Sequence, residues 1–124
     1  MNKWDVVLVG YPFSRLLVTK IRPAVIVSPD AYHQKGEDIL VILVTSNTSR
    51  QSPHDIIVTT AHPEFKQTGL RKDSAIRVSK IMTLEKSKVQ HVLGKLGASL
   101  SAEVERELRA FLELPPYQPP LGQR

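Results

Sequence analysis

The sequence predicts one mainly β domain, a small barrel-like or strongly coiled antiparallel sheet with short helical insertions and one C-terminal helix. Six short segments have the apolar or alternating pattern of strands, and no helix-length segment separates one from the next. A single amphipathic segment follows the last of them. A chain of 124 residues is one domain that buries enough apolar surface for a core without disulfides.

The first three strands are predicted from short apolar runs. Residues 5–11 and 39–45 are rich in β-branched side chains and too short for core helices. Residues 22–28 form the strand between them, and Pro23 is acceptable near its start because the first residues of a strand tolerate a missing backbone N–H. The polar connections at residues 13–21 and 31–38 are expected to be loops.

The other three strands are more polar. Residues 55–59 are predicted as the fourth strand, and residues 74–79 alternate as in a half-exposed fifth strand. Residues 89–96 are the last expected strand, in which Gly94 would allow a bulge. Between these strands we expect loops at residues 46–53 and 61–73, the second with a helical turn.

Two helices are expected near the C-terminus. Thr83 would cap a short helix over residues 84–88, and Ser101 would be the N-cap of the terminal helix. The apolar face of that helix consists of Val104, Leu108, Phe111 and Leu112. The predicted domain is residues 1–114, and the proline-rich tail at residues 115–124 is expected to be extended or disordered.

Composition excludes several kinds of site. The chain has no cysteine, so disulfides and thiolate metal sites are excluded, and its four histidines lack a metal-ligand spacing. No apolar run is long enough to span a bilayer, and no signal-peptide pattern precedes the first strand. We therefore expect a cytoplasmic protein with no membrane partner, no metal and no cofactor.

The positive charge lies in the body of the domain. The net charge is +5, and residues 1–100 contain 14 basic and 8 acidic side chains, against 3 and 4 in residues 101–124. A cationic body suits a polyanionic partner such as RNA or DNA, although a basic surface can also serve solubility alone.

Four segments carry a resemblance to a known family. They are DVVLVGYPF, KIRPAVIVS, ILVILVTSN and LRKDSAIRVSKIMTLEK, in that order. Together they resemble the PemK/MazF-like toxins of bacterial toxin–antitoxin modules over residues 4–114, most specifically in the first two segments at this spacing. The resemblance implies an SH3-like barrel, usually homodimeric, and a metal-independent endoribonuclease that cuts single-stranded RNA. It also implies a small antitoxin whose disordered acidic segment occupies the RNA groove.

The resemblance also implies three catalytic residues. The arginine of the family's Arg-Pro motif falls on Arg22, the hydroxyl at the end of the third strand falls on Thr45, and a further arginine falls on Arg77. RNA can be cut by attack of its own 2′-hydroxyl on the adjacent phosphorus. The planar guanidinium of Arg22 suits the charged phosphorane, and the Thr45 hydroxyl could donate to a phosphate oxygen. Arg77 would add charge or a proton.

Further polar residues are candidates for binding RNA. They are Lys20, Ser46, Asn47, Arg50, His54, Arg71 and Lys80. The alternative for the cations is an ordinary solvated surface, and Ser46 and Asn47 may only turn the chain through side-chain to backbone hydrogen bonds.

The general base is not placed by the resemblance. Several members of the family have an acidic residue where this chain has Ser79, and the segment before the Arg-Pro motif reads SRLLVTK instead of a Gly- and Glu-rich pattern. His54 titrates in a suitable range but is more often structural at such a position. Asp73 is expected to pair with Arg71 and Lys72.

Two other functions stay open because a fold does not fix a function. A relative of this fold poisons DNA gyrase by binding, so the chain could be a non-catalytic toxin or a plain nucleic-acid-binding module. It could also be a degenerate toxin that has lost its activity.

Overall fold

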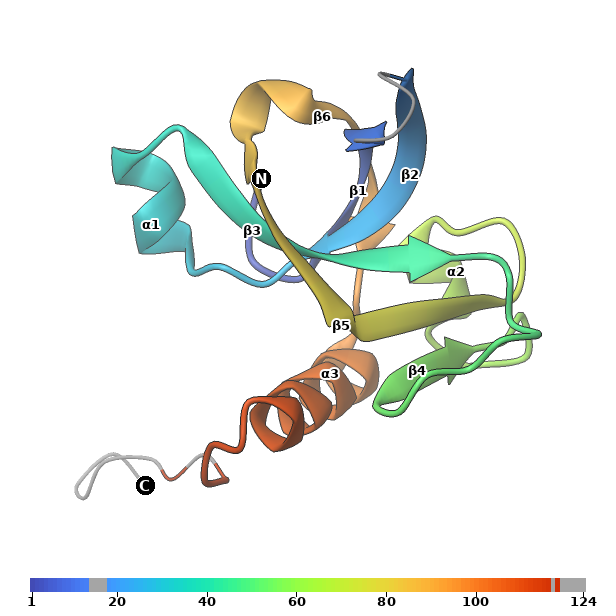
Figure 1. Cartoon of the computed structure of the whole chain (residues 1–124). Coiled ribbons are helices and arrows are strands. Elements are labelled where there is room, and N and C mark those ends of the chain that lie inside the picture. The colour runs from blue at the N-terminus through green and yellow to red at the C-terminus, as the bar shows by residue number, and fades with distance from the viewer. Residues whose placement is uncertain (14–17, 117, 119–124) are drawn as a thin grey trace.

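The structure, a computed structural model, describes residues 1–13, 18–116 and 118. Six strands form one antiparallel sheet in the order β4-β5-β3-β2-β1-β6 (Figure 1). Their bounds are β1 (Asp5–Phe13), β2 (Val18–Ile26), β3 (Asp38–Thr45), β4 (Asp55–Val58), β5 (Ser74–Glu85) and β6 (Val89–Lys95). The predicted class, mainly β with one C-terminal helix, is confirmed. The predicted tail falls largely outside the described residues.

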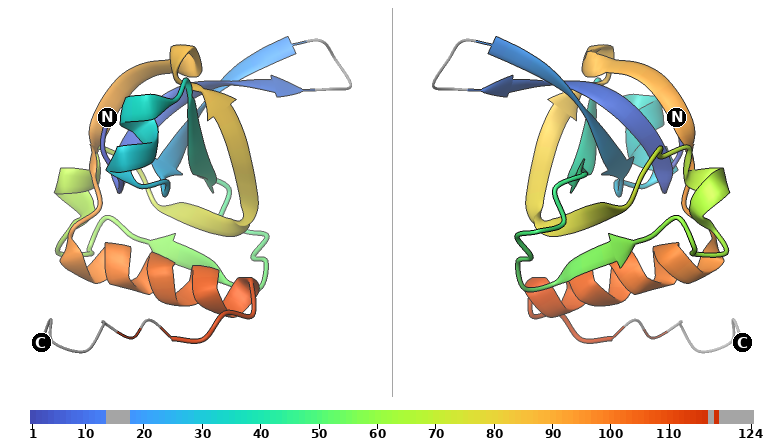
Figure 2. Two further views of the ribbon diagram at one scale, coloured as in Figure 1. Left: turned by 90° about the vertical axis from the view of Figure 1, so that its left-hand side faces the viewer. Right: turned by 90° about the vertical axis from the view of Figure 1, so that its right-hand side faces the viewer.

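Three helices and a single 3₁₀ turn complete the described fold. They are α1 (Asp30–Lys35), α2 (Phe65–Thr68), η1 (Lys86–Lys88) and α3 (Ala98–Phe111). Figure 2 shows α3 running alongside β4 below the coiled part of the sheet, and α3 also contacts β5. The helix therefore covers the sheet at the end where β4 and β5 pair.

The core consists of two apolar clusters that share the central strands. In β3, Ile39 and Val41 belong to one cluster, whereas Ile42 and Val44 belong to the other. Both faces of β3 are thus buried, which explains its continuous apolar run. Leu100 and Val104 of α3 are fully buried against the second of these clusters.

The predicted apolar face of the terminal helix is only partly correct. Val104 is fully buried and Leu108 packs against the core, but Phe111 and Leu112 are 38% and 48% exposed. Phe111 instead packs edge-on against the His54 ring, and Leu112 follows the end of the helix.

Two of the predicted loops are wrong. Residues 18–21 belong to β2, because the β1–β2 ladder continues from Gly10↔Ile21 to Phe13↔Val18. Residues 30–35 form α1 within the second predicted loop. One turn of this helix buries His33, whose Nε2 lies 2.5 Å from the buried Ser28 hydroxyl. The polar composition of residues 31–38 hid that single buried side chain.

The helix predicted over residues 84–88 is also wrong. Thr83 pairs with Leu40 inside β5, and only residues 86–88 form a 3₁₀ turn. The long strand β5 has an irregularity in its pairing with β3. Val44 pairs with Ile76, whereas Ile42, only two residues away, pairs with Ile81. A smaller irregularity lies where Val6 pairs with Gly94 and Val7 with Val92, so the bulge expected at Gly94 is confirmed.

The N-terminus of α3 is capped by a distant side chain. The helix begins at Ala98, three residues before the predicted cap Ser101. Glu64, which precedes α2, accepts hydrogen bonds from the backbone N–H groups of Ser99 (2.9 Å) and Leu100 (2.8 Å). These bonds satisfy donors that the helix itself leaves unpaired, so no local capping residue is needed.

This cap predicts a stability that depends on pH. The backbone hydrogen bonds from Leu100 and Ser99 lower the pKa of Glu64 from its ordinary value of 4.5. A lowered folded-state pKa stabilises the protein above pH 4.5, and the contribution is lost as the pH falls through the lowered value. We expect Glu64→Gln to lower Tm by a few degrees at neutral pH, and the difference from wild type to shrink on acidification.

Thermal unfolding followed by circular dichroism across this pH range checks the prediction. Glu105→Gln, which removes a carboxylate farther along α3, is the matched control. A Tm difference for Glu64→Gln that is constant with pH would contradict the assignment of Glu64 as an ionised cap.

Candidate functional site

Arg22 and Thr45 lie on one face of the sheet. The β2–β3 ladder ends at the pair Ala24 and Leu43, and Arg22 and Thr45 each lie two residues beyond that pair on their strands. Because side chains alternate along strands, both residues occupy the face that carries Ala24 and Leu43. Arg22 is exposed and Thr45 is half-buried. Two segments far apart in the sequence thus bring a guanidinium and a hydroxyl to the same side of the sheet.

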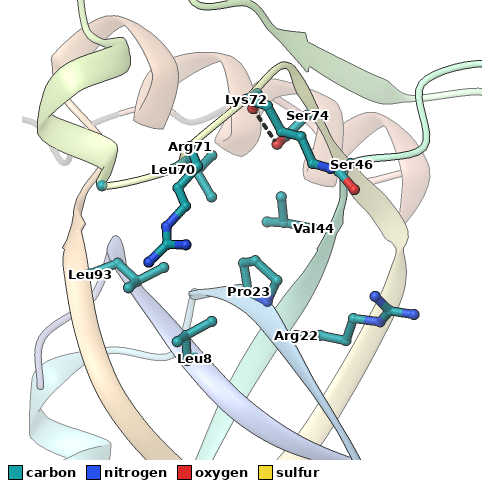
Figure 3. Close-up of a pocket in the computed structure, with 11 residues that line it drawn as sticks. Leu8, Arg22, Pro23, Val44, Ser46, Leu70, Arg71, Lys72, Ser74 and Leu93 are labelled. Carbon is teal, nitrogen blue, oxygen red and sulfur yellow. Dashed lines mark hydrogen bonds between the residues drawn. The ribbon is translucent and has the colours of Figure 1, made fainter.

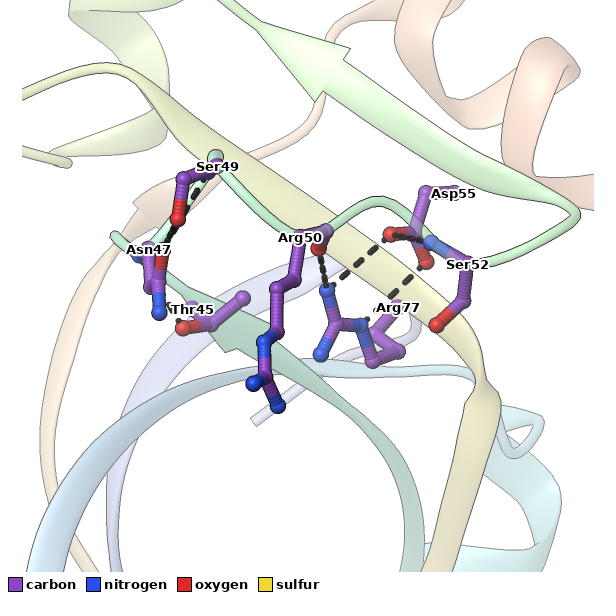
Figure 4. Close-up of polar contacts among 7 residues, drawn as sticks. All are labelled: Thr45, Asn47, Ser49, Arg50, Ser52, Asp55 and Arg77. Atoms are coloured by element: carbon purple, nitrogen blue, oxygen red, sulfur yellow. Dashed lines mark hydrogen bonds and ion pairs between the residues drawn. The ribbon is translucent and has the colours of Figure 1, made fainter.

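Arg77 shares this face with Thr45. Thr45 pairs with Ala75 across the β3–β5 ladder, and Arg77 follows two residues later on β5. Figure 4 shows Thr45 and Arg77 on neighbouring strands, with the Arg50 side chain lying between them. All three residues that the resemblance nominates for catalysis therefore face the same side.

The Arg77 guanidinium already has protein partners. Its Nη2 donates to Asp55 Oδ2 at 3.1 Å and to the Arg50 carbonyl oxygen at 2.6 Å (Figure 4). The Asp55 side chain is only 2% exposed and that of Arg77 is 21% exposed. A nearly buried carboxylate requires such a partner, so Arg77 joins β5 to β4 and to the loop before it. These bonds fix Arg77 in place and offset part of its charge.

The Thr45 hydroxyl is oriented by the loop that follows it. Thr45 Oγ1 accepts a hydrogen bond from the Asn47 N–H at 3.1 Å. Asn47 Oδ1 in turn accepts from the backbone N–H of Ser49 at 3.2 Å, so Asn47 turns the chain as one alternative expected. Because Thr45 Oγ1 accepts in this arrangement, its own proton stays available for donation to a ligand.

A pocket of about 360 Å³ opens beside these residues. Arg22, Ser46 and Arg71, all of them candidates from the sequence, line it together (Figure 3). Figure 3 shows Arg71 extending over the pocket, whereas the Arg22 side chain on the opposite side points away from the apolar walls. Sequence reasoning missed most of the remaining lining residues, because they come from separate segments that share no local pattern.

The other candidates for RNA binding divide into two groups. Most of them are exposed on the surface: Lys20, Asn47, Arg50 and Lys80. His54, however, is held by α3, because its Nδ1 lies 2.9 Å from Glu107 Oε2 and its ring packs edge-on against Phe111. The alternative that His54 has a structural role agrees with these contacts.

The expected pairing of Asp73 is wrong. Asp73 Oδ1 accepts a hydrogen bond from the Thr60 N–H at 2.8 Å, and no ion pair joins Asp73 to Arg71 or Lys72 among the described residues. This carboxylate joins the loops at either end of the β4–β5 connection. It leaves the two neighbouring cations available to solvent or to a ligand.

The described residues contain neither a cluster of metal ligands nor a membrane-spanning helix. Within residues 1–13, 18–116 and 118, no three His, Cys, Asp or Glu side chains gather as metal ligands would. In the same part of the chain, no helix combines the length and apolar character that crossing a membrane requires.

Comparison with known proteins gives a consistent result. Residues 2–112 match the family model described as the PemK-like, MazF-like toxin of type II toxin–antitoxin systems. Endoribonuclease MazF6 of Mycobacterium tuberculosis is 31% identical over 97 residues, which cover 77% of this chain and 81% of the relative. Endoribonuclease MazF2 of Mycobacterium bovis matches equally well.

Solved structures share the fold. A mycobacterial endoribonuclease in complex with its cognate antitoxin superposes with a TM-score of 0.72 at 19% identity, covering 93% of this chain and 97% of the other. A MazE–MazF complex from Deinococcus radiodurans gives a TM-score of 0.71 at 21% identity, covering 93% and 98%. The fold is thus that of these proteins over nearly the whole chain.

Proposed function

The chain belongs to the PemK-like, MazF-like toxins of type II toxin–antitoxin systems, and from this membership we propose that it is a metal-independent endoribonuclease acting on single-stranded RNA in the cytoplasm. Two lines of support go beyond membership. Relatives at 31% identity are named endoribonucleases. The exposed Arg22 and the half-buried Thr45 occupy one face of the sheet, next to a pocket and a cationic surface.

The proposed reaction is transesterification within the RNA. The 2′-oxygen of one nucleotide attacks the adjacent phosphorus, a new P–O2′ bond forms, and the P–O5′ bond breaks. The 2′-hydroxyl loses its proton and the departing 5′-oxygen gains one, so the products are a 2′,3′-cyclic phosphate and a 5′-hydroxyl. Negative charge accumulates on the phosphorane oxygens at the transition state.

Arg22 has the main catalytic role in this proposal. Its guanidinium is charged at any relevant pH and presents paired N–H donors that match two phosphate oxygens. Its strand position next to Pro23 fixes the backbone before the substrate arrives, which is the condition for electrostatic stabilisation without reorganisation. Thr45 would donate a hydrogen bond from its hydroxyl group to a phosphate oxygen.

We propose that Arg77 acts through its charge and by holding the Arg50 backbone in place. Its bonds to Asp55 and to the Arg50 carbonyl oxygen support a fixed location at the edge of the site. An arginine is a poor proton donor because its guanidinium group stays charged. We therefore do not assign it the role of general acid.

Two protein partners are part of the proposal. The first is an antitoxin with an acidic disordered segment, supported by solved complexes of similar proteins with their antitoxins. The cations that would follow the RNA backbone, including Arg50, Arg71 and Lys80, would also attract such a segment. The second is another copy of this chain, as the family resemblance implies.

A non-catalytic binding protein is the second candidate function. The observation that favours it is that both titratable residues considered for the general base already have partners: Asp73 bonds to Thr60 and His54 to Glu107. Neither is presented as a free base toward Arg22. RNA that is retained in a salt-dependent manner but never cut would support this candidate.

Cleavage assayed in excess EDTA tests the proposed function. The purified protein is expected to cut diverse single-stranded RNAs at full rate in EDTA and to leave 5′-hydroxyl ends, which a polynucleotide kinase can label directly. Replacement of the ribose before the scissile phosphate by deoxyribose should abolish cutting. An activity that requires added Mg²⁺, or a wild type inert on diverse RNAs, would contradict the proposal.

A further inference from the structure

The pocket beside Arg22 combines an apolar interior with a cationic rim. Five of its lining residues are apolar: Leu8, Pro23, Val44, Leu70 and Leu93. Ser46 and Ser74 add hydroxyl groups, and the cations are Arg22, Arg71 and Lys72 (Figure 3). No acidic side chain is among the described residues that line it. This combination suits a ligand with a flat or apolar group attached to a negative charge.

The size of the pocket limits what it can hold. Ligand pockets are mostly apolar with a few polar groups and span roughly 300–1,000 Å³. At about 360 Å³, this one lies at the lower end of that range. It therefore suits one ring-sized group, and a length of polymer would have to run outside it.

The side of the pocket formed by the loop after α2 is fixed against β6. Gly69 has a φ of +75°, and a Cβ placed there would lie 2.2 Å from the Leu93 carbonyl oxygen. Thr68 is fully buried, and its hydroxyl accepts from the Leu70 N–H at 3.1 Å while donating to the Phe65 carbonyl oxygen. The backbone that presents Leu70 and Arg71 is thus held in place without a ligand.

The far end of the same loop is held as well. The Ser74 hydroxyl donates to the Lys72 carbonyl oxygen at 2.8 Å (Figure 3). Asp73 accepts from the Thr60 N–H next to it. A pocket fixed at both ends of one wall is preformed, which lowers the entropic cost of binding.

We propose that this pocket is a subsite for one unstacked base of single-stranded RNA, with Arg71 stacking on the base and Ser46 contacting its edge. The inference rests on the proposed function, because it describes how that site takes its substrate. Proteins that read single strands place splayed bases on apolar or guanidinium planes while cations follow the phosphates. Arg22, on the opposite side of the pocket, would then be aimed at the phosphate next to the held base.

Base-by-base deletion in the RNA tests the subsite. The probe is a short single-stranded RNA with the preferred cut sequence, or the tightest-binding sequence if no cut occurs, and with deoxyribose at the attacking nucleotide so that it binds uncut. Each base is replaced in turn by an abasic residue, which keeps the phosphate. At one position beside the scissile phosphate, we expect removal of the base to weaken wild-type binding about ten-fold.

Variants connect that position to the pocket. The loss of binding caused by removing the base at this position should fall to about two-fold in two variants. They are Arg71→Ala and Ser46→Phe, and the phenylalanine ring of the second would fill the pocket. Both substituted residues are exposed, so the fold should tolerate the changes. Lys66→Ala removes an exposed cation from α2, outside the pocket, and should keep the full penalty.

The outcomes separate this inference from the proposed function. An abasic profile that is identical in wild type, Arg71→Ala and Ser46→Phe would overturn the subsite even if RNA is cut. The expected profile on RNA that is never cut would overturn the nuclease and leave the subsite in place. An unchanged profile in Ser46→Phe, together with lost binding of an acidic leucine-containing peptide, would assign the pocket to a protein partner instead.

Discussion

Arg22→Ala is expected to lower the rate of RNA cleavage by about 10²- to 10³-fold, the usual cost of removing one preorganised donor to transition-state charge. The reason is that this exposed guanidinium lies on the same face of the sheet as Thr45 and lines the pocket. Single-turnover cleavage of a labelled RNA measures the effect on the chemical step directly. Binding of an uncleavable RNA should weaken far less, because the charge it stabilises develops mainly in the transition state.

Two further variants make the result specific. Arg22→Lys keeps the charge but loses the paired donors, so it should recover only part of the lost rate. Arg106→Ala removes an exposed arginine of α3 away from the site and should cleave at the wild-type rate. Because Arg22 is exposed, its loss should leave Tm nearly unchanged. A fully active Arg22→Ala would remove the basis for the proposed mechanism.

Gly69→Ala is expected to destabilise the domain by about 2–5 kcal/mol, the sum of a left-handed backbone penalty and a steric overlap. The overlap is severe because the added Cβ would meet backbone atoms of Leu93, which cannot rotate away. Relief requires the loop after α2 to separate from β6, and this loop carries Leu70 and Arg71 into the pocket. We therefore also expect weaker RNA binding in the fraction that folds.

Urea denaturation provides the measurement, and Gly36→Ala provides the matched control. A Cβ at Gly36 would make only an ordinary 3.5 Å contact with the Tyr32 carbonyl oxygen, and the φ there is −123°. This control should change the free energy of unfolding by less than about 1 kcal/mol. Equal stabilities for the two alanine variants would contradict the described packing of Gly69 on β6.

The strands could be predicted from the sequence because each of them has a local apolar or alternating pattern. The apolar run of β3 and the β-branched run of β1 indicate burial without any knowledge of their neighbours. The irregularity in β5 could not be predicted in this way. The irregular stretch of β5 depends on which residues of β3 pair with it. That pairing register is set only when the sheet assembles.

The prediction of the residue that caps α3 failed for a similar reason. Ser101 is a good N-cap by type, but Glu64 satisfies the first helical N–H groups from a position more than thirty residues earlier in the chain. A propensity records only what a residue can do for its own segment. The same limit hid Leu70 and Leu93, which line the pocket only after α2 is placed on β6.

The residues of the candidate site likewise include some that the sequence indicated and some contacts that it did not. Arg22 and Thr45 follow from the resemblance, and the strand pairing is consistent with their joint use. The bonds of Arg77 to Asp55 and of His54 to Glu107 had no signal in the sequence, because they connect elements whose contact depends on the position of α3 and β4. Long-range ion pairs of this kind require the coordinates.

The two apolar clusters have a consequence for how the domain unfolds. β1, β2, β3 and β5 each contribute side chains to both clusters, so the opening of one cluster removes the backing of the other. Such shared strands predict a single cooperative unfolding transition, as small single domains usually show. We would accordingly expect a partner that inhibits this protein to act by covering its surface, because neither cluster is expected to open alone.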